Sequence, residues 1–150
     1  MDIAIIGGGI AGLSLAMNLH DRGIRAHVFE RAPEIKELGV GITLLPHAMR
    51  EFAALGLRDE LLRAGVVIRE SCFFSRFGQL IYREDRGQHA GYVYPEVSIH
   101  RGRLHVILYR AALAAARRRS RPHRPRMRSG RAGRERRNDL FPDIQLRQLA

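Results

Sequence analysis

The sequence predicts an α/β fold of the Rossmann-like type, built on a parallel βαβ unit to which further strands and helices are added. Three observations predict it: an apolar run over 3–6, a glycine turn from Gly7 to Gly12, and a second apolar run that ends at Glu30. In dinucleotide-binding crossovers a glycine turn joins the first strand to its helix, and an acid follows about 20 residues later. The order of these features therefore indicates a dinucleotide site.

The first elements follow in βαβ order. We expect a buried parallel strand over 2–6, a helix over 10–22 and a second strand over 24–29. Gly23 is well placed to end the helix, and Pro33 ends regular structure after the second strand. The helix offers four apolar positions for packing: Ala11, Leu13, Ala16 and Met17.

The next stretch mixes a loop with two short helices. Residues 38–45 are interrupted by glycines and predict a loop or a strand. Pro46 is suited to the first position of a helix that runs to Leu55, just before Gly56. A second short helix is expected over 57–64, where Gly65 follows it.

The rest of the ordered part is predicted to be strand-rich until a final helix. Strands over 66–76 and 79–83 flank Phe77-Gly78 and predict a hairpin, although this is not one of the strongest turn sequences. A further strand is expected over 92–99. A helix over 101–116 would place one apolar face against the core, formed by Leu104, Ile107, Leu108 and Ala111.

Charge divides the chain into two parts. The 150 residues carry a formal net charge of +11, yet residues 1–116 hold 14 Lys and Arg against 12 acids, whereas residues 117–150 hold 12 Arg against 3 acids. The second part contains no lysine, loses hydrophobic periodicity and has prolines at 122 and 125. We therefore expect a domain over 1–116 and a largely disordered Arg-rich tail over 117–150.

Cysteine and hydropathy patterns bear on location. The single Cys72 excludes an intrachain disulfide, fits a reducing compartment, and lies in an apolar run where a small buried side chain is expected. No apolar stretch approaches the ~20 residues of a membrane span, and Met1-Asp2 is not a basic signal-peptide start. A cytoplasmic location is the resulting expectation.

Each glycine of the turn has a physical role in such a site. Gly7 would allow the tight turn, Gly9 would let backbone approach a pyrophosphate, and Gly12 would let helix and strand pack closely. The helix N-terminus would present N–H groups and partial positive charge to the phosphates. Glu30 would accept hydrogen bonds from ribose hydroxyls.

Three motifs in order carry a family resemblance: the glycine turn with Glu30-Arg31, the stretch 38–42 with Pro46, and Tyr94-Pro95 followed by 98–102 with Leu104. With these motifs the chain resembles the amino-terminal part of an FAD-dependent aromatic-ring monooxygenase, and within that family it is most similar to the phenazine-1-carboxylate hydroxylase type. The resemblance covers residues 1 to about 116. It implies that FAD, reduced by NAD(P)H and reacting with O₂, hydroxylates a small aromatic substrate.

The resemblance also implies which residues bind the cofactor. The turn would hold the FAD pyrophosphate, Glu30 the adenosine ribose, and Arg31 would lie beside the adenine end. The backbone of Gly39, Gly41 and Ile42 would lie against the flavin ring, and Arg101 would reach the phosphate and ribityl region. The six turn residues are Gly7, Gly8, Gly9, Ile10, Ala11 and Gly12. No catalytic side chain is expected, because the cofactor performs the chemistry. No metal site is expected, because the spacing of the histidines does not form one.

Two departures from the family limit what the chain is expected to do. The family has two further FAD motifs downstream, one with Asp-Gly and one with Gly-Asp, and neither dipeptide occurs in this sequence. We therefore expect an incomplete sheet, weak or absent FAD binding and no turnover by these 150 residues. The lysine-free tail leads to the hypothesis that it is translated out of frame, which the alternative reading frames of the coding DNA would test.

Two other functions remain open for this sequence. A basic tail could contact nucleic acid phosphates, although it lacks aromatic residues for base stacking, so only non-specific polyanion binding is expected. A simple NAD-binding module could use the same glycine turn. The motifs around Gly41 and Arg101 favour FAD over that alternative.

Overall fold

A computed structural model describes residues 2–32, 40–119 and 144–148 of the chain. The chain forms two compact units: unit 1 comprises Met1–Pro33 and Leu108–Ala150, and unit 2 comprises Glu34–Ile107. Each unit contains a three-stranded β-sheet of its own. Gly39 and the tail over 120–143 lie outside the described residues.

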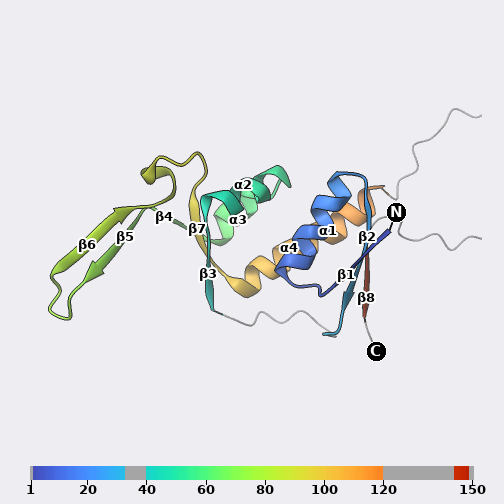
Figure 1. Ribbon diagram of the computed structural model, residues 1–150, viewed down its shortest axis with the longest axis horizontal. Helices are drawn as coiled ribbons and strands as arrows, with labels where there is room; N and C mark the ends of the chain where they lie inside the picture. The colour runs from blue at the N-terminus through green and yellow to red at the C-terminus, as the bar shows by residue number, and fades with distance from the viewer. Residues whose placement is uncertain (1, 33–39, 120–143, 149–150) are drawn as a thin grey trace, which may run out of the picture. The chain divides into compact units, whose positions relative to one another are not determined.

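Unit 1 contains the expected βαβ unit. Its elements are β1 (Asp2–Ile6), α1 (Ile10–Asp21), β2 (Arg25–Glu30), the second part of α4 (Arg101–Arg119) and β8 (Ile144–Gln148). The three strands form one sheet in the order β1-β2-β8, and both pairs are parallel (Figure 1). The parallel βαβ prediction is confirmed.

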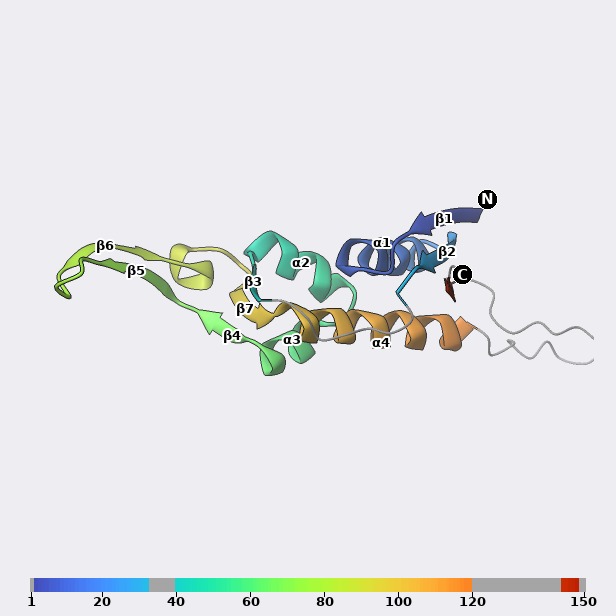
Figure 2. The same cartoon turned by 90° about the horizontal axis from the view of Figure 1, so that it is seen from below.

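One face of this sheet carries the core of unit 1. Ile5, Ala26 and Val28 form a buried cluster with Ala16 of α1 and Ala116 of α4. Both helices therefore cover the same face, as the neighbouring positions of α1 and of the end of α4 beside β2 indicate in Figure 1 and Figure 2. Leu13, Ala16 and Met17 are buried as expected, whereas Ala11 is exposed in the first turn of α1.

Unit 2 is a small α+β arrangement. A three-stranded antiparallel sheet in the order β3-β7-β4 packs with two helices, and β5 and β6 form a separate hairpin. Fully buried side chains include Leu61, Val97 and Leu104. The elements are β3 (Gly41–Leu44), α2 (Pro46–Ala54), α3 (Arg58–Ala64), β4 (Val66–Ile68), β5 (Glu70–Phe74), β6 (Leu80–Asp85), the 3₁₀ helix η1 (Gly87–Ala90), β7 (Glu96–His100) and the start of α4.

Two predicted strands of unit 2 differ from the structure. The strand expected over 66–76 is interrupted at Arg69, because β4 pairs with β7 while β5 pairs with β6. The strand expected from Tyr92 begins only at Glu96, because Pro95 has no N–H to donate to a ladder. Cys72 is partly exposed on the hairpin, which provides no buried residues around it.

Two segments of the predicted tail, 117–119 and 144–148, are regular in the structure. Residues 117–119 complete α4, and Ile144–Gln148 form β8. The expected disorder from residue 117 onward therefore does not hold for these residues. The composition of the tail did not predict β8. A short segment can form a strand when β2 supplies partners for its backbone hydrogen bonds, and composition does not report such pairing.

Within the residues that the structure describes, every helix is too short or too polar to cross a lipid bilayer.

Candidate functional site

The glycine turn has the geometry that a close strand-to-helix connection requires. Gly7 has φ of +104°, a conformation that side-chain-bearing residues rarely adopt, and its N–H donates to the Phe29 carbonyl at 2.7 Å. A Cβ on Gly12 would overlap the carbonyl oxygen of Gly7. The first turn of α1 therefore lies directly against the turn that leaves β1.

The mouth of this turn fits an anionic group such as a pyrophosphate. Gly9 is the N-cap of α1 and no side chain caps the helix, whose first turn also lacks acidic residues. A Cβ placed on Gly9 would meet no atom within 4 Å, so the backbone lies open at this point. Ile10 and Ala11 begin the helix, where N–H groups have no intrahelical acceptor. These donors, and the partial positive charge of the helix end, suit a phosphate.

Glu30 has a role that the sequence did not indicate. Its Oε2 accepts a hydrogen bond from the Gly8 N–H at 2.6 Å, and its Oε1 accepts one from the Ala32 N–H at 2.7 Å. A Cβ on Gly8 would come within 3.2 Å of the Glu30 side chain, so a larger residue at this position would crowd the carboxylate. Because a carboxylate has about four lone-pair sites, a group anchored in this way can also accept bonds from ribose hydroxyls.

Arg31 lies at the end of β2, next to Glu30. It is exposed and follows the last residue of the strand. The structure thus brings the predicted pyrophosphate and ribose residues together at the carboxyl ends of β1 and β2, with Arg31 beside them. Their contacts with FAD stay predictions.

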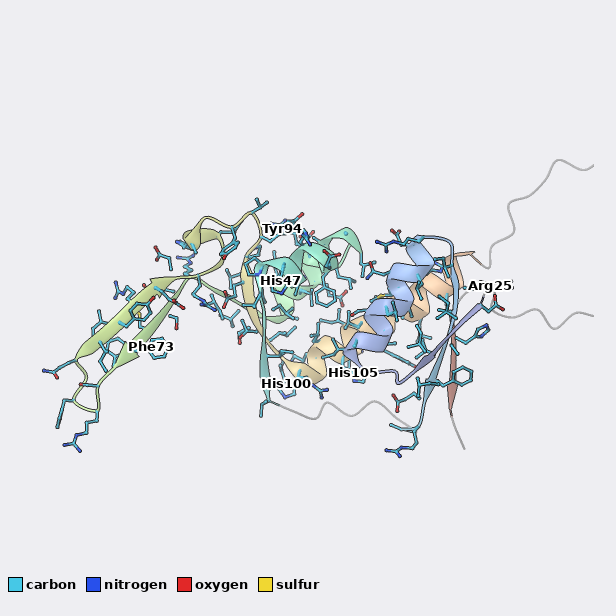
Figure 3. The ribbon with its side chains drawn as sticks, in the orientation of Figure 1. Arg25, His47, Phe73, Tyr94, His100 and His105 are labelled. Atoms are coloured by element: carbon cyan, nitrogen blue, oxygen red, sulfur yellow. The ribbon has the colours of Figure 1, made fainter. Side chains whose placement is uncertain are left out.

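Unit 2 gathers the second group of predicted residues. Gly41 and Ile42 begin β3 and pair with His100 and Ile99 of β7. The Arg101 N–H donates to the Val40 carbonyl at 3.1 Å, so the start of α4 is held beside the start of β3. Figure 3 shows His100 at this end of β7. Arg101 itself is exposed.

A cavity of about 670 Å³ lies elsewhere in unit 2, at the opposite end of β3 and β7. Its walls come from the start of α2, the end of β6 and the loop before β7, and they include His47, Tyr92 and Tyr94. Figure 3 shows His47, from the start of α2, and Tyr94, from the loop before β7. Sequence patterns did not predict this cavity, because its walls are far apart in the sequence.

An ion-pair network fixes one wall of the cavity. Arg86 donates to Glu96 Oε1 from Nε at 3.2 Å and from Nη2 at 3.0 Å, and Nη1 bonds to Glu84. The Glu96 side chain is only 5% exposed, so its charge depends on this partner. The hydrogen bond and the charge of Glu96 raise the pKa of Arg86 above its usual value.

Over the described ranges, with residues 33–39 and 120–143 excluded, no three His, Cys, Asp or Glu side chains are grouped in a way that could hold a metal ion.

The family model described as an FAD binding domain matches residues 1–121. Among curated proteins, the chain is 44% identical over 111 residues to the phenazine 1,6-dicarboxylic acid hydroxylase PhzS of Lysobacter antibioticus, covering 73% of this chain and 27% of that protein. It is 42% identical over 110 residues to the 3-amino-4-hydroxybenzoate 2-monooxygenase of Streptomyces cremeus, covering 71% and 28%.

A solved structure agrees with these matches. The fold resembles that of PqsL from P. aeruginosa in complex with 2-aminobenzoylacetate, with a TM-score of 0.67 and 25% identity over 77% of this chain and 31% of that one. The chain thus spans between a quarter and a third of the length of these relatives.

Proposed function

We propose, from the premise that this chain belongs to the FAD binding domain family, that it forms the amino-terminal part of an FAD-dependent aromatic hydroxylase. The observation that carries the proposal is the glycine turn closed by Glu30, in a segment that matches the family over 121 residues. FAD, when bound, supplies the redox chemistry that connects NAD(P)H with O₂. This chain supplies a cradle for the phosphates and an acceptor for the ribose.

The substrate class forms the finer part of the proposal. The curated relatives are named for a phenazine dicarboxylic acid and an aminohydroxybenzoate, which supports a small aromatic substrate. Because the chain spans 27% of the first relative, hydroxylation is proposed for the assembled enzyme rather than for these 150 residues alone. A cytoplasmic location belongs to the same proposal and rests on the single cysteine.

Equilibrium dialysis against FAD and NAD tests the cofactor assignment. We expect the chain to bind FAD weakly, yet about tenfold or more tightly than NAD. Gly9→Val should abolish this binding, because its side chain would fill the open space at the mouth of the turn. Ala54→Val, at an exposed position at the end of α2 and outside the predicted cofactor residues, controls for the effect of an added valine side chain on folding.

Equal affinity for the two dinucleotides would contradict the assignment to FAD and would favour a general nucleotide module. Binding of FAD that Gly9→Val leaves unchanged would place the cofactor outside the glycine turn.

A further inference from the structure

The cavity of unit 2 combines apolar and aromatic lining residues with carboxylates. Tyr92 and Tyr94 come from the loop before β7, and Leu45 and Pro46 lie at the start of α2. Tyr92 is 60% exposed and Leu45 is 38% exposed, so apolar surface is open to a ligand. The volume of about 670 Å³ is within the usual range of small-molecule sites. These residues suit the face of an aromatic ring.

Acidic groups outnumber available cations around the cavity. Its charged lining residues are Glu84, Asp85, Glu96, Arg50 and Arg86. Each of the three side-chain nitrogens of Arg86 bonds to one of these carboxylates. Arg50 bonds instead to Glu51, which is outside the lining. Both arginines are thus engaged, and the charged groups of the cavity favour a ligand that donates hydrogen bonds over one that carries a negative charge.

Glu96 is the buried acid of this group, and half of its carboxylate is unused. Its side chain is 5% exposed, and both bonds from Arg86 go to Oε1. In the described part of the chain no hydrogen bond reaches Oε2. His20 Nδ1 is the only fully buried side-chain nitrogen or oxygen that lacks a partner among the residues described, so Oε2 keeps access to the cavity that Glu96 lines.

The backbone around Glu96 holds this carboxylate in place. Glu96 is the first residue of β7 and pairs with Ile68 of β4. A Cβ on Gly87 would lie 2.5 Å from the backbone nitrogen of Glu96, so the turn after β6 packs closely against the strand here. An acceptor that is fixed and largely removed from water discriminates against ligands that leave it unpaired.

The two other acids lack this combination of shelter and free acceptor. Glu84 uses both oxygens, because Oε1 bonds to Arg86 and Oε2 accepts from the Tyr82 hydroxyl at 3.0 Å. Asp85 makes no hydrogen bond or ion pair within the described ranges, but it is exposed, so water competes for its oxygens. Oε2 of Glu96 is therefore the acceptor best suited to select a ligand.

We infer that the cavity binds an aromatic ring through a hydroxyl or amino group that donates to Glu96 Oε2, and that Glu96 determines specificity by excluding a ring carboxylate from this position. The inference rests on the proposed function, which supplies the class of small aromatic ligands. A second carboxylate here would face a like charge without a free cation. A ring such as the dicarboxylic acid in the name of the Lysobacter antibioticus relative could bind only with its carboxyl groups directed away from Glu96.

Three ligands that differ in one substituent test the inference on the unsubstituted chain. 2-Naphthol offers a donor, 2-methoxynaphthalene lacks it, and 2-naphthoate carries a negative charge. Isothermal titration calorimetry is run at about pH 8, where an unperturbed histidine is neutral, so that His47 adds no charge. We expect 2-naphthol to bind about tenfold or more tightly than either of the others. In nuclear magnetic resonance spectra, 2-naphthol should shift the amide signals of residues 86–96 most.

A matched pair of variants tests the role of Glu96. Glu96→Gln keeps the shape and an acceptor for Arg86, but it replaces one oxygen by a donor. The preference for 2-naphthol over 2-methoxynaphthalene should fall to about twofold or less, and 2-naphthoate should bind more tightly. Glu84→Gln removes the same charge from the same cavity, but both oxygens of Glu84 are already bonded, so the preference should remain about tenfold.

The outcomes separate this inference from the proposed function. Equal affinities of the unsubstituted chain for 2-naphthol and 2-methoxynaphthalene, or amide shifts largest outside 86–96, would overturn the inference without requiring a variant to fold. Equal effects of Glu96→Gln and Glu84→Gln on the preference would also overturn it. In either case selective binding of FAD would leave the proposed function standing. A Glu96-dependent preference in a chain that binds FAD and NAD equally would overturn the proposed function and leave the cavity site standing.

Discussion

At the scale of single residues, Glu30 joins two parts of the candidate site. Its carboxylate holds the Gly8 N–H and the Ala32 N–H, so the glycine turn is closed by the same side chain that is expected to bind the ribose. Charge-assisted hydrogen bonds of this kind are stronger than neutral ones. The position of the ribose acceptor is therefore fixed by the turn that would hold the pyrophosphate.

Two glycines of the turn should differ in how much their substitution destabilises the fold. Gly12→Ala should lower the free energy of unfolding by about 1–3 kcal/mol or more, because the new Cβ overlaps backbone that cannot move aside easily. Gly9→Ala should cost only about 0.5–1 kcal/mol, the difference between these residues at an N-cap. Urea denaturation followed by circular dichroism would measure both values. Equal losses would mean that the helix does not pack against the turn as described.

Sequence reasoning succeeded for residues whose role is set by the local backbone. The positive φ of Gly7 and the close approach at Gly12 follow from a tight strand-to-helix turn, and both are present. The contact of Glu30 with Gly8 was missed because it depends on the register between β1 and β2. The predicted contacts of Arg31 and Arg101 with the cofactor stay predictions.

At the scale of elements, β7 is the central strand of its sheet and also contributes to one wall of the cavity. It pairs with β3 on one side and β4 on the other, and its first residue, Glu96, holds Arg86 in the loop that precedes it. The ion pair thus ties this loop to the centre of the sheet. We expect the loop to lose its position when the pair is broken.

Arg86→Met should destabilise unit 2 far more than Arg50→Met. The first substitution leaves the buried Glu96 carboxylate without that cation, whereas Arg50 pairs with an exposed Glu51. A melting temperature lower by several degrees is expected for Arg86→Met and almost no change for Arg50→Met, as measured by differential scanning calorimetry. Addition of Glu96→Leu should restore much of the loss. Similar melting curves for the two single variants would refute the structural role of the pair.

Elements with clear end signals were predicted closely, and those without them were not. Pro46 begins α2, and Gly56, with φ of +76°, follows its end. The strand expected over 66–76 carries no such signal at Arg69, where the pairing partner changes from β7 to β6. Partner exchange is a tertiary event, so a periodic pattern along one segment could not show it.

At the scale of the whole molecule, positive charge is concentrated in the last part of the sequence. Residues 1–116 carry a net charge of +2 (14 − 12) and residues 117–150 one of +9 (12 − 3). The Arg-rich residues 117–150 favour contacts with phosphates, which do not depend on base sequence. Non-specific binding of nucleic acid is the expected consequence.

A salt titration would test this consequence. Binding to duplex DNA of mixed sequence should weaken linearly with the logarithm of salt concentration, with a slope of about −0.9 for each phosphate contacted. Replacing Arg124 and Arg126 by Gln should reduce the slope by about 1–2. The same change at Arg63 and Arg76, in the near-neutral part, should leave it unchanged. Fluorescence anisotropy gives the affinities, and a marked preference for one DNA sequence would contradict incidental electrostatics.

The discontinuity of unit 1 has a consequence for biosynthesis. Its two parts flank the whole of unit 2, and β2 pairs with β8 near the far end of the chain. The ribosome therefore synthesises every residue of unit 2 before it reaches β8. Because domains begin to fold while they are synthesised, unit 2 has the opportunity to fold first, and β2 then waits with one edge exposed. During translation this interval is when the nascent chain most needs protection by a chaperone against pairing with other strands.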